Sequence, residues 1–207
     1  MDICREDFTI NVNDAHALTL FSKGFENIFK KNFTDRFTDV VILCIGTDRS
    51  TGDCLGPLVG HKLKLIRYRR VFVYGTLDDP VHAKNLCEVL EGIQKSHSNP
   101  FIIAVDACLG KPERIGYITM GTGPLRPGAG VKKPLPEIGH IHIVGVVNMS
   151  GFMEYLILQN TRLNLVMRMA DTISSGIHFS IWKYISEQGV MQNNSDIDIR
   201  TKGYMYD

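Results

Sequence analysis

The chain has 207 residues, of which 44% are hydrophobic and 22% charged, a profile typical of a soluble globular protein. This length suits one domain with a substantial core and is short for two. The formal net charge of +1 gives no electrostatic basis for binding nucleic acid or an anionic membrane surface. No apolar run approaches the ~20 residues of a membrane span. The N-terminus, MDICREDFTI, lacks the apolar core of a signal peptide, and five cysteines without a CxxC spacing indicate reduced thiols in a cytoplasm.

Strand-like and helix-like patterns alternate along the chain. Apolar runs predict strands over residues 40–45, 71–75, 101–107, 115–120 and 141–147. Most of these runs are continuous, which is typical of strands covered on both faces in a parallel sheet. Helical patterns occupy 15–29, 57–66, 80–94 and 150–185, and the last is expected to be two helices, interrupted near Asn160–Thr161 or near Ser174–Gly176. We therefore predict an α/β fold, a doubly wound three-layer sandwich with a mostly parallel sheet.

The domain organisation is expected to be simple. Residues 1–187 are predicted to form a single domain, and residues 188–207 a polar C-terminal tail. The Gly/Pro-rich stretch from 120 to 137 is the one long irregular loop, and loops of this length in compact domains are usually functional or mobile.

Polar side chains are expected to gather at one edge of the sheet, because sites in open α/β sheets form beyond the carboxyl ends of the strands. The first strand is followed by the loop GTDRSTGDCLGP (Gly46–Pro57), which holds Asp53 just before a predicted helix start at Pro57. The third strand ends at Asp106, and Asn148 follows the fifth. These three residues, far apart in the sequence, are predicted to converge on one spot.

Each of the three residues also has a purely structural interpretation. Asp53 would then cap the following helix, Asp106 would bond only loop amides, and Asn148 would be a plain N-cap. Two carboxylates at the same end of a buried sheet, however, repel unless they share a proton, bind a cation or bind a donor-rich ligand. A shared proton gives one acid and one base around a water, whereas a cation gives a metal hydrolase or a metal sensor.

Other polar residues nearby are weaker candidates. Cys54 and Cys108 lie next to the two acids in the sequence. They could be metal ligands or a nucleophile, but most cysteines in apolar surroundings are core residues. His140 and His142 share one face at the start of a strand, opposite the expected site, and are interpreted as structural. Arg126 lies on the irregular loop, where it serves either substrate docking or an ordinary charged surface.

Known families share these motifs. ILCIGTDRSTGDCLGP, IIAVDACLGKPERIGYI and GPLRPGAGVKKPLPEIG…IVGVVN resemble the spore germination protease of endospore-forming bacteria, over about residues 40–155. The same skeleton resembles the hydrogenase maturation endopeptidases, and nearly the whole chain resembles the small sporulation protein family known as YyaC. The resemblance implies the fold of those proteases, a role in sporulation and a cytoplasmic location, with the forespore as one option.

Carried over residue by residue, the resemblance assigns Asp53 to the first-loop acid and Asp106 to the strand-end acid, both implicated in function in those families. Where the maturation endopeptidases have a histidine that looks like a third metal ligand, this chain has Asn148. An amide oxygen is a poorer ligand for nickel or zinc than imidazole, so no cofactor is predicted. A divalent metal held by Asp53 and Asp106, with Cys54 or Cys108 as replacement ligands, is the alternative.

The leading hypothesis is an endopeptidase that acts on a peptide or a partly unfolded protein segment. One acid of the Asp53/Asp106 pair is the general base, and the other, protonated, polarises the scissile carbonyl. The substrate-binding group is expected to comprise Gly46, Arg126, Gly128, Gly130 and Asn148. The alternative is a catalytically inactive relative that keeps the pocket and acts as a binding or regulatory protein in sporulation. No nucleic-acid or membrane partner is expected, and a homo-oligomer is left open.

Overall fold

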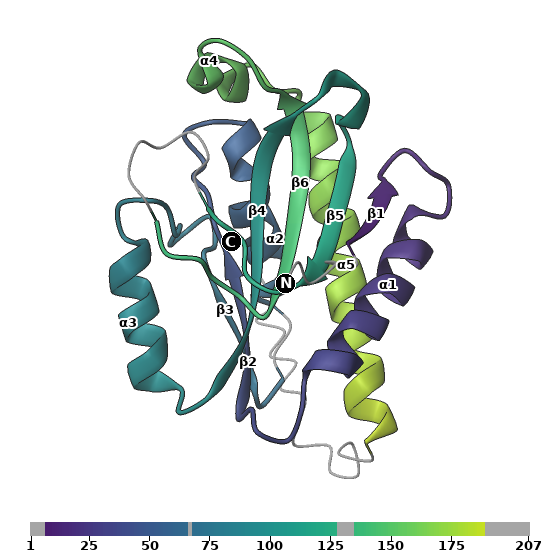
Figure 1. The fold of residues 1–207 in the computed structure, drawn as a ribbon, viewed down its shortest axis with the longest axis vertical. Helices are drawn as coiled ribbons and strands as arrows, with labels where there is room; N and C mark the ends of the chain where they lie inside the picture. The colour runs from purple at the N-terminus through teal and green to yellow at the C-terminus, as the bar shows by residue number, and fades with distance from the viewer. Residues whose placement is uncertain (1–6, 66–67, 128–134, 189–207) are drawn as a thin grey trace, which may run out of the picture.

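The computed structural model describes residues 7–65, 68–127 and 135–188, whose strands form one six-stranded sheet (Figure 1). The strands are β1 (Phe8–Asn11), β2 (Asp39–Cys44), β3 (Val71–Tyr74), β4 (Pro100–Gly110), β5 (Tyr117–Thr122) and β6 (Ile141–Met149). The helices are α1 (Ala17–Asn32), α2 (Leu55–Leu63), α3 (Leu86–Ser96), α4 (Glu154–Gln159) and α5 (Leu163–Glu187), with short 3₁₀ turns η1 (Gly52–Cys54) and η2 (Pro112–Arg114).

The sheet has the order β1-β5-β6-β4-β2-β3 and is parallel from β6 to β3. The predicted α/β fold with a mostly parallel sheet is confirmed. Strands β5 and β1 continue it in the antiparallel sense. The sequence did not predict β1, because its four residues FTIN lack the apolar run that marked the central strands; as an edge strand, it pairs only with β5.

Helices cover the two faces of the sheet unequally. Helices α1, α2 and α5 share one apolar cluster with the first face, in which Phe21, Phe25 and Phe29 of α1 are fully buried or nearly so. On the second face, Leu86 and Ile93 of α3 pack against the residues of β2 that face them. Among the described residues, α3 is the only helix in that second cluster. Among the described residues, loops and the short helix α4 (Glu154–Gln159) border the second face of β4 and β6.

The C-terminal helical pattern is interrupted at Asn160–Thr161, one of the two predicted positions, because α4 ends at Gln159 and α5 begins at Leu163. The other candidate, Ser174–Gly176, lies inside the continuous helix α5. A Cβ atom on Gly176 would lie 2.2 Å from Cδ1 of Phe21. Gly176 thus serves the close packing of α5 on α1, which local sequence patterns do not reveal.

Two predictions concern parts of the chain that the structure does not describe. Residues 189–207 of the predicted tail (188–207) lie outside the described residues, and so do Gly128 and Gly130 of the irregular loop. The single-domain boundaries therefore stay a prediction. None of the helices described is both long and apolar enough to cross a membrane.

Candidate functional site

The loop that follows β2 folds back on the end of its own strand. The backbone N–H of Thr47 donates a hydrogen bond to the carbonyl oxygen of Asp53 (3.1 Å). Gly46 has φ +141°, and a Cβ atom there would lie 2.0 Å from that same carbonyl oxygen, so the turn requires glycine. Likewise, a Cβ atom on Gly56 would lie 2.1 Å from the carbonyl oxygen of Ile45. The two glycines let η1 and α2 begin directly against the strand end, and this packing holds Asp53 there.

Asp106 lies inside β4, at the point where the pairing with β2 ends. Strand β2 pairs with β4 as far as Cys44 and Val105, and β4 then runs on to Gly110 along β6. The expectation that Asp106 ends its strand is therefore wrong, because β6 supplies a partner beyond it. The side chain is 6% exposed, and its Oδ1 accepts a hydrogen bond from the backbone N–H of Ala107 (2.8 Å).

Asp53 and Asp106 line one cavity of about 920 Å³, at the upper end of the range of ~300–1,000 Å³ typical of ligand pockets. Its walls come from the loop after β2 with η1, from the face of β4 and β6, from the segment after β5, and from α4. The cavity thus lies on the part of the sheet that α3 leaves uncovered. Two acids that are far apart in the sequence thus line the same cavity, as the strand-end argument expects.

Burial controls the protonation of Asp53. Desolvation raises the pKa of its carboxyl group, while a backbone hydrogen bond from Thr47 and the nearby charge of His82 act in the opposite direction with smaller effect. Asp53 therefore holds its proton to a higher pH than an exposed aspartate does. The sequence did not point to His82, whose proximity comes from the pairing of Ile45 with Val81.

Comparison with known proteins places the chain in a family. Residues 9–176 match the family described as "Protein of unknown function (DUF1256)". The chain belongs to this family. Over 138 residues, 67% of each chain, it is 62% identical to "Uncharacterized protein YyaC" of Bacillus subtilis (strain 168), which confirms the resemblance to YyaC.

A solved structure confirms the expected fold. The [NiFe] hydrogenase maturation protease HycI from Thermococcus kodakarensis KOD1 matches 77% of this chain and 99% of its own length, with a TM-score of 0.50 and 17% sequence identity. At this level of identity, the likeness shows a common fold. The DUF1256 chain therefore has the fold that the maturation endopeptidases suggested.

The donor groups around the two acids do not fit a nickel or zinc site. In the described part of the chain, no group of three or more His, Cys, Asp and Glu side chains is arranged to hold a metal ion. Burial and the charge of Asp106 raise the pKa of the Cys108 thiol to about 11, and burial with nearby Asp48 and Asp53 raises the pKa of Cys54. Both thiols are thus protonated at neutral pH and would have to lose their protons to bind a metal.

Asn148 lies within β6, and its side chain holds α4. Its Nδ2 donates to the carbonyl oxygen of Ile157 and to Oγ1 of Thr161, both at 3.2 Å, and its Oδ1 accepts from the backbone N–H of Met149 (2.8 Å). The described residues that line the cavity do not include Asn148. It is not the N-cap of α4 either, since that position is Met153. A role of Asn148 in substrate binding stays a prediction. Its structural role is to hold the end of α4 through these hydrogen bonds.

The remaining predicted substrate-binding residues are placed differently from one another. Arg126 lines the cavity, with its side chain 84% exposed and paired with Glu137 at 2.5 Å. Leu125 and Ile138 exchange backbone hydrogen bonds of 2.9 Å, which close the base of the irregular loop. Gly46 lies behind Asp53 and shapes the loop, and it is not among the described residues that line the cavity.

His142 lines the cavity, although its position in the sequence suggested the opposite end of the sheet. Asp106 pairs with Val144, so His142 lies only two residues along β6 from that pair, on the same uncovered face. Its Nδ1 lies 3.1 Å from the carbonyl oxygen of Gly123, and its Nε2 lies 3.4 Å from Oδ1 of Asp7.

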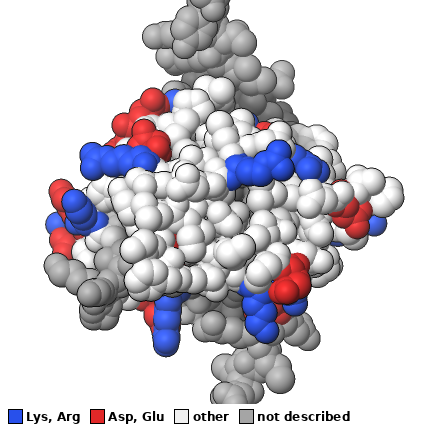
Figure 2. Space-filling model, turned by 90° about the horizontal axis from the view of Figure 1, so that it is seen from above, with Lys and Arg blue, Asp and Glu red and all other residues white. Residues whose placement is uncertain are grey.

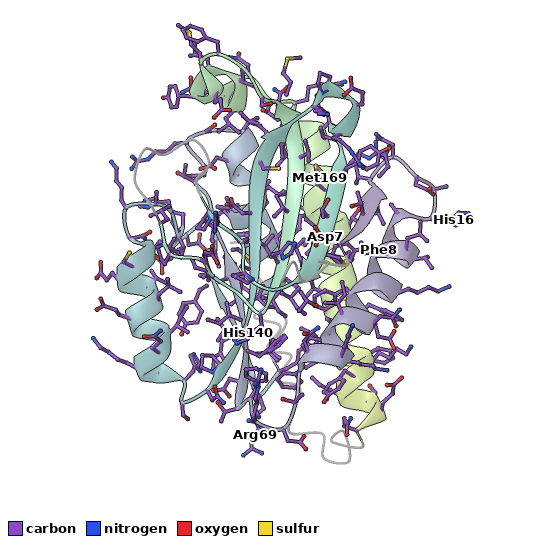
Figure 3. All side chains as sticks on the ribbon, in the orientation of Figure 1. Asp7, Phe8, His16, Arg69, His140 and Met169 are labelled. Atoms are coloured by element: carbon purple, nitrogen blue, oxygen red, sulfur yellow. The ribbon has the colours of Figure 1, made fainter. Side chains whose placement is uncertain are left out.

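His140 fits the structural interpretation. It lies toward the end of the sheet away from α4 (Figure 3). Its ring stacks on Phe101 with 5.1 Å between centroids, and its Nδ1 accepts a hydrogen bond from the N–H of Ile102 (3.0 Å).

Proposed function

We propose that this chain is an endopeptidase of the germination-protease type that acts in sporulation, with Asp53 and Asp106 activating a water. The observation that carries the proposal is that Asp53 and Asp106 line the same cavity. Two carboxyl groups with different protonation states can act as the acid and the base of one hydrolytic step. The fold shared with a maturation protease supports this class of reaction.

The raised pKa of Asp53 sets the division of roles in this proposal. Asp53, whose pKa is raised by burial, is the protonated partner that donates its proton to the scissile carbonyl oxygen. Asp106 is the base: it takes a proton from the water as the water oxygen adds to the carbonyl carbon. The C–N bond then breaks, the leaving amine takes a proton from Asp106, and Asp53 takes back a proton from one hydroxyl group of the intermediate as the new carboxyl group forms. Ala107 orients this carboxyl group through its backbone N–H.

The substrate in this proposal is an extended or partly unfolded protein segment. The cavity is open to a chain because loops and the short helix α4, instead of a packed helix, form its outer wall. Arg126 at the rim can bind a substrate carbonyl or acidic side chain. To do so it gives up its ion pair with Glu137, which is exposed and therefore weak.

The test is a comparison of new protein N-termini in an extract of sporulating cells treated with wild type, Asp53→Asn, Asp106→Asn or Asp48→Asn. Asp48 is exposed in the same loop and is not among the described cavity residues, so it is a matched control. Loss of a general acid or base typically lowers the rate about 10²–10⁴-fold. We expect termini that form with wild type and Asp48→Asn and are lost with Asp53→Asn and Asp106→Asn.

A second candidate is a binding or regulatory protein that keeps the cavity without the chemistry. It is favoured by Asn148, which stands where the maturation endopeptidases have a histidine and whose amide is engaged with α4. If all four folded proteins leave the extract unchanged, the endopeptidase proposal fails and this candidate takes its place.

A further inference from the structure

The segment around α4 carries a concentrated run of exposed apolar side chains. Five of the eight residues from 149 to 156 are large, apolar and exposed, with Phe152 at 88% and Tyr155 at 68%. We call this set the apical patch; it consists of Met149, Phe152, Met153, Tyr155 and Leu156. Exposed apolar side chains gathered in this way are typical of interaction sites, whereas scattered ones are ordinary.

The apical patch does not serve the core. Helix α4 has only six residues, none of them buried, and it forms the top of the molecule in Figure 1. Seen from above, this end is largely free of charged side chains, which lie toward its periphery (Figure 2). Met153, the N-cap residue that precedes α4, has φ 60°, a conformation that costs a non-glycine residue about 1 kcal/mol or more and that often marks functional segments.

The apical patch is continuous with the cavity. Glu154, Tyr155 and Leu158 of α4 line the same cavity as Asp53 and Asp106. Tyr155 therefore belongs to both surfaces, with Phe152 and Leu156 close to it along the chain. A ligand that lies against the two acids and extends past Tyr155 meets the apical patch next.

We infer that the apical patch binds an apolar stretch of the protein substrate beside the bond to be cleaved, which rests on the proposed function. Because the cavity and the apical patch meet at Tyr155, the occupant that fits best is a single chain that lies across both of them. Met149 and Met153 are flexible and polarisable, and such side chains adapt to apolar partners of varied shape. The scarcity of charge over this end favours an uncharged stretch of several residues over an acidic or basic motif.

The experiment measures binding and cleavage separately with two fluorescein-labelled 16-residue peptides. One has a Leu/Phe-rich centre within a Gly/Ser/Asn background, and the other has serine at those central positions. Fluorescence anisotropy gives the dissociation constants, and mass spectrometry of the same samples detects cleavage. The proteins are wild type, Phe152→Ser/Leu156→Ser and, as a matched control, Phe179→Ser, which changes an exposed aromatic residue of α5. Phe152→Ser alone replaces the double variant if the latter does not fold.

We expect wild type and Phe179→Ser to prefer the apolar peptide by about tenfold or more, and the patch variant to lose that preference. Equal binding of the apolar peptide by wild type and the patch variant overturns the inference, as does a wild type that does not discriminate. If the patch variant changes only self-association in sedimentation, the occupant is a second copy of this chain and the inference is wrong. Absence of cleavage by every protein counts against the endopeptidase, while the binding data still decide whether the apical patch holds an apolar chain.

Discussion

At the scale of single residues, Gly46 decides whether the loop that carries Asp53 can close. Its φ of +141° and the 2.0 Å that would separate a Cβ atom from the carbonyl oxygen of Asp53 leave no room for a side chain. A role of Gly46 in substrate binding stays a prediction. Its visible role is to bring the backbone of Thr47 and Asp53 into hydrogen-bonding distance.

Gly46→Ala is expected to lower the free energy of unfolding by about 2 kcal/mol or more, since the native backbone is incompatible with a Cβ atom. The matched control is Gly92→Ala in α3, where no atom lies within 4 Å of an added Cβ. There the same substitution should raise stability by about 0.5–1 kcal/mol, through helix propensity. Urea unfolding of the two variants checks both signs, and equal effects at the two sites would contradict this account.

At the scale of elements, α4 depends on β6 for its position. None of the six residues of α4 is buried, and no side-chain hydrogen bond caps its first turn. Asn148 and Thr161 connect the last turn of α4 to the sheet. Both side chains donate a hydrogen bond to the carbonyl oxygen of Ile157, and Asn148 also donates to Oγ1 of Thr161. A short helix with so little buried surface is held mainly by such contacts.

Asn148→Ala is expected to speed amide hydrogen exchange across residues 154–160, because two hydrogen bonds worth about 1 kcal/mol each are lost. Exchange in the middle of α5 should not change. Asn160→Ala is the control, because the side chain of Asn160 donates to the carbonyl oxygen of Leu156 within its own turn and, among the described residues, to no other element. Unchanged exchange over 154–160 in Asn148→Ala would mean that α4 is held by other contacts.

At the scale of the whole molecule, the unequal covering of the sheet creates the site. Three helices bury one face, whereas α3 covers only part of the other, and the remaining part lies beneath the cavity. Acidic groups placed there lose part of their hydration, which raises the pKa of Asp53. Functional sites commonly reduce stability in this way.

The raised pKa of Asp53 predicts how stability depends on pH. Between its ordinary value of 3.8 and its folded value, the folded state binds more protons than the unfolded state, so stability falls as pH rises through this window. Above the window the whole penalty persists, because the buried group is ionised. Asp53→Asn carries no charge and should therefore be more stable than wild type at pH 7.

Urea unfolding between pH 4 and pH 8 checks this expectation. The difference between Asp53→Asn and wild type should shrink as the pH falls toward 4, because the folded-state carboxyl group then holds its proton and the unfolded-state group, with its ordinary pKa of 3.8, begins to take one up. Asp48→Asn, at an exposed site in the same loop, is the control. A stability difference for Asp53→Asn that is constant over the whole range would show that burial of the charge is not its cause.

The sequence by itself determined the central strands, the main helices and the two acids. Continuous apolar runs mark strands buried on both faces, and periodic runs mark helices, since both depend on local spacing. A general property of parallel sheets led to the prediction that Asp53 and Asp106 share one site, and the two residues line one cavity. The edge strand β1 was not predicted, because its four residues are too few and too polar to form a recognisable apolar run.

Only the tertiary structure decided which face of the sheet stays open and what borders it. The register of β4 with β6 puts His142 beside the pair formed by Asp106 and Val144, and the hydrogen bonds of Asn148 direct it to α4. The tertiary structure also shows that Gly176 allows α5 to pack closely on α1 and that the apical patch adjoins the cavity. Each of these facts depends on contacts between residues far apart in the chain, and local spacing carries no information about such contacts.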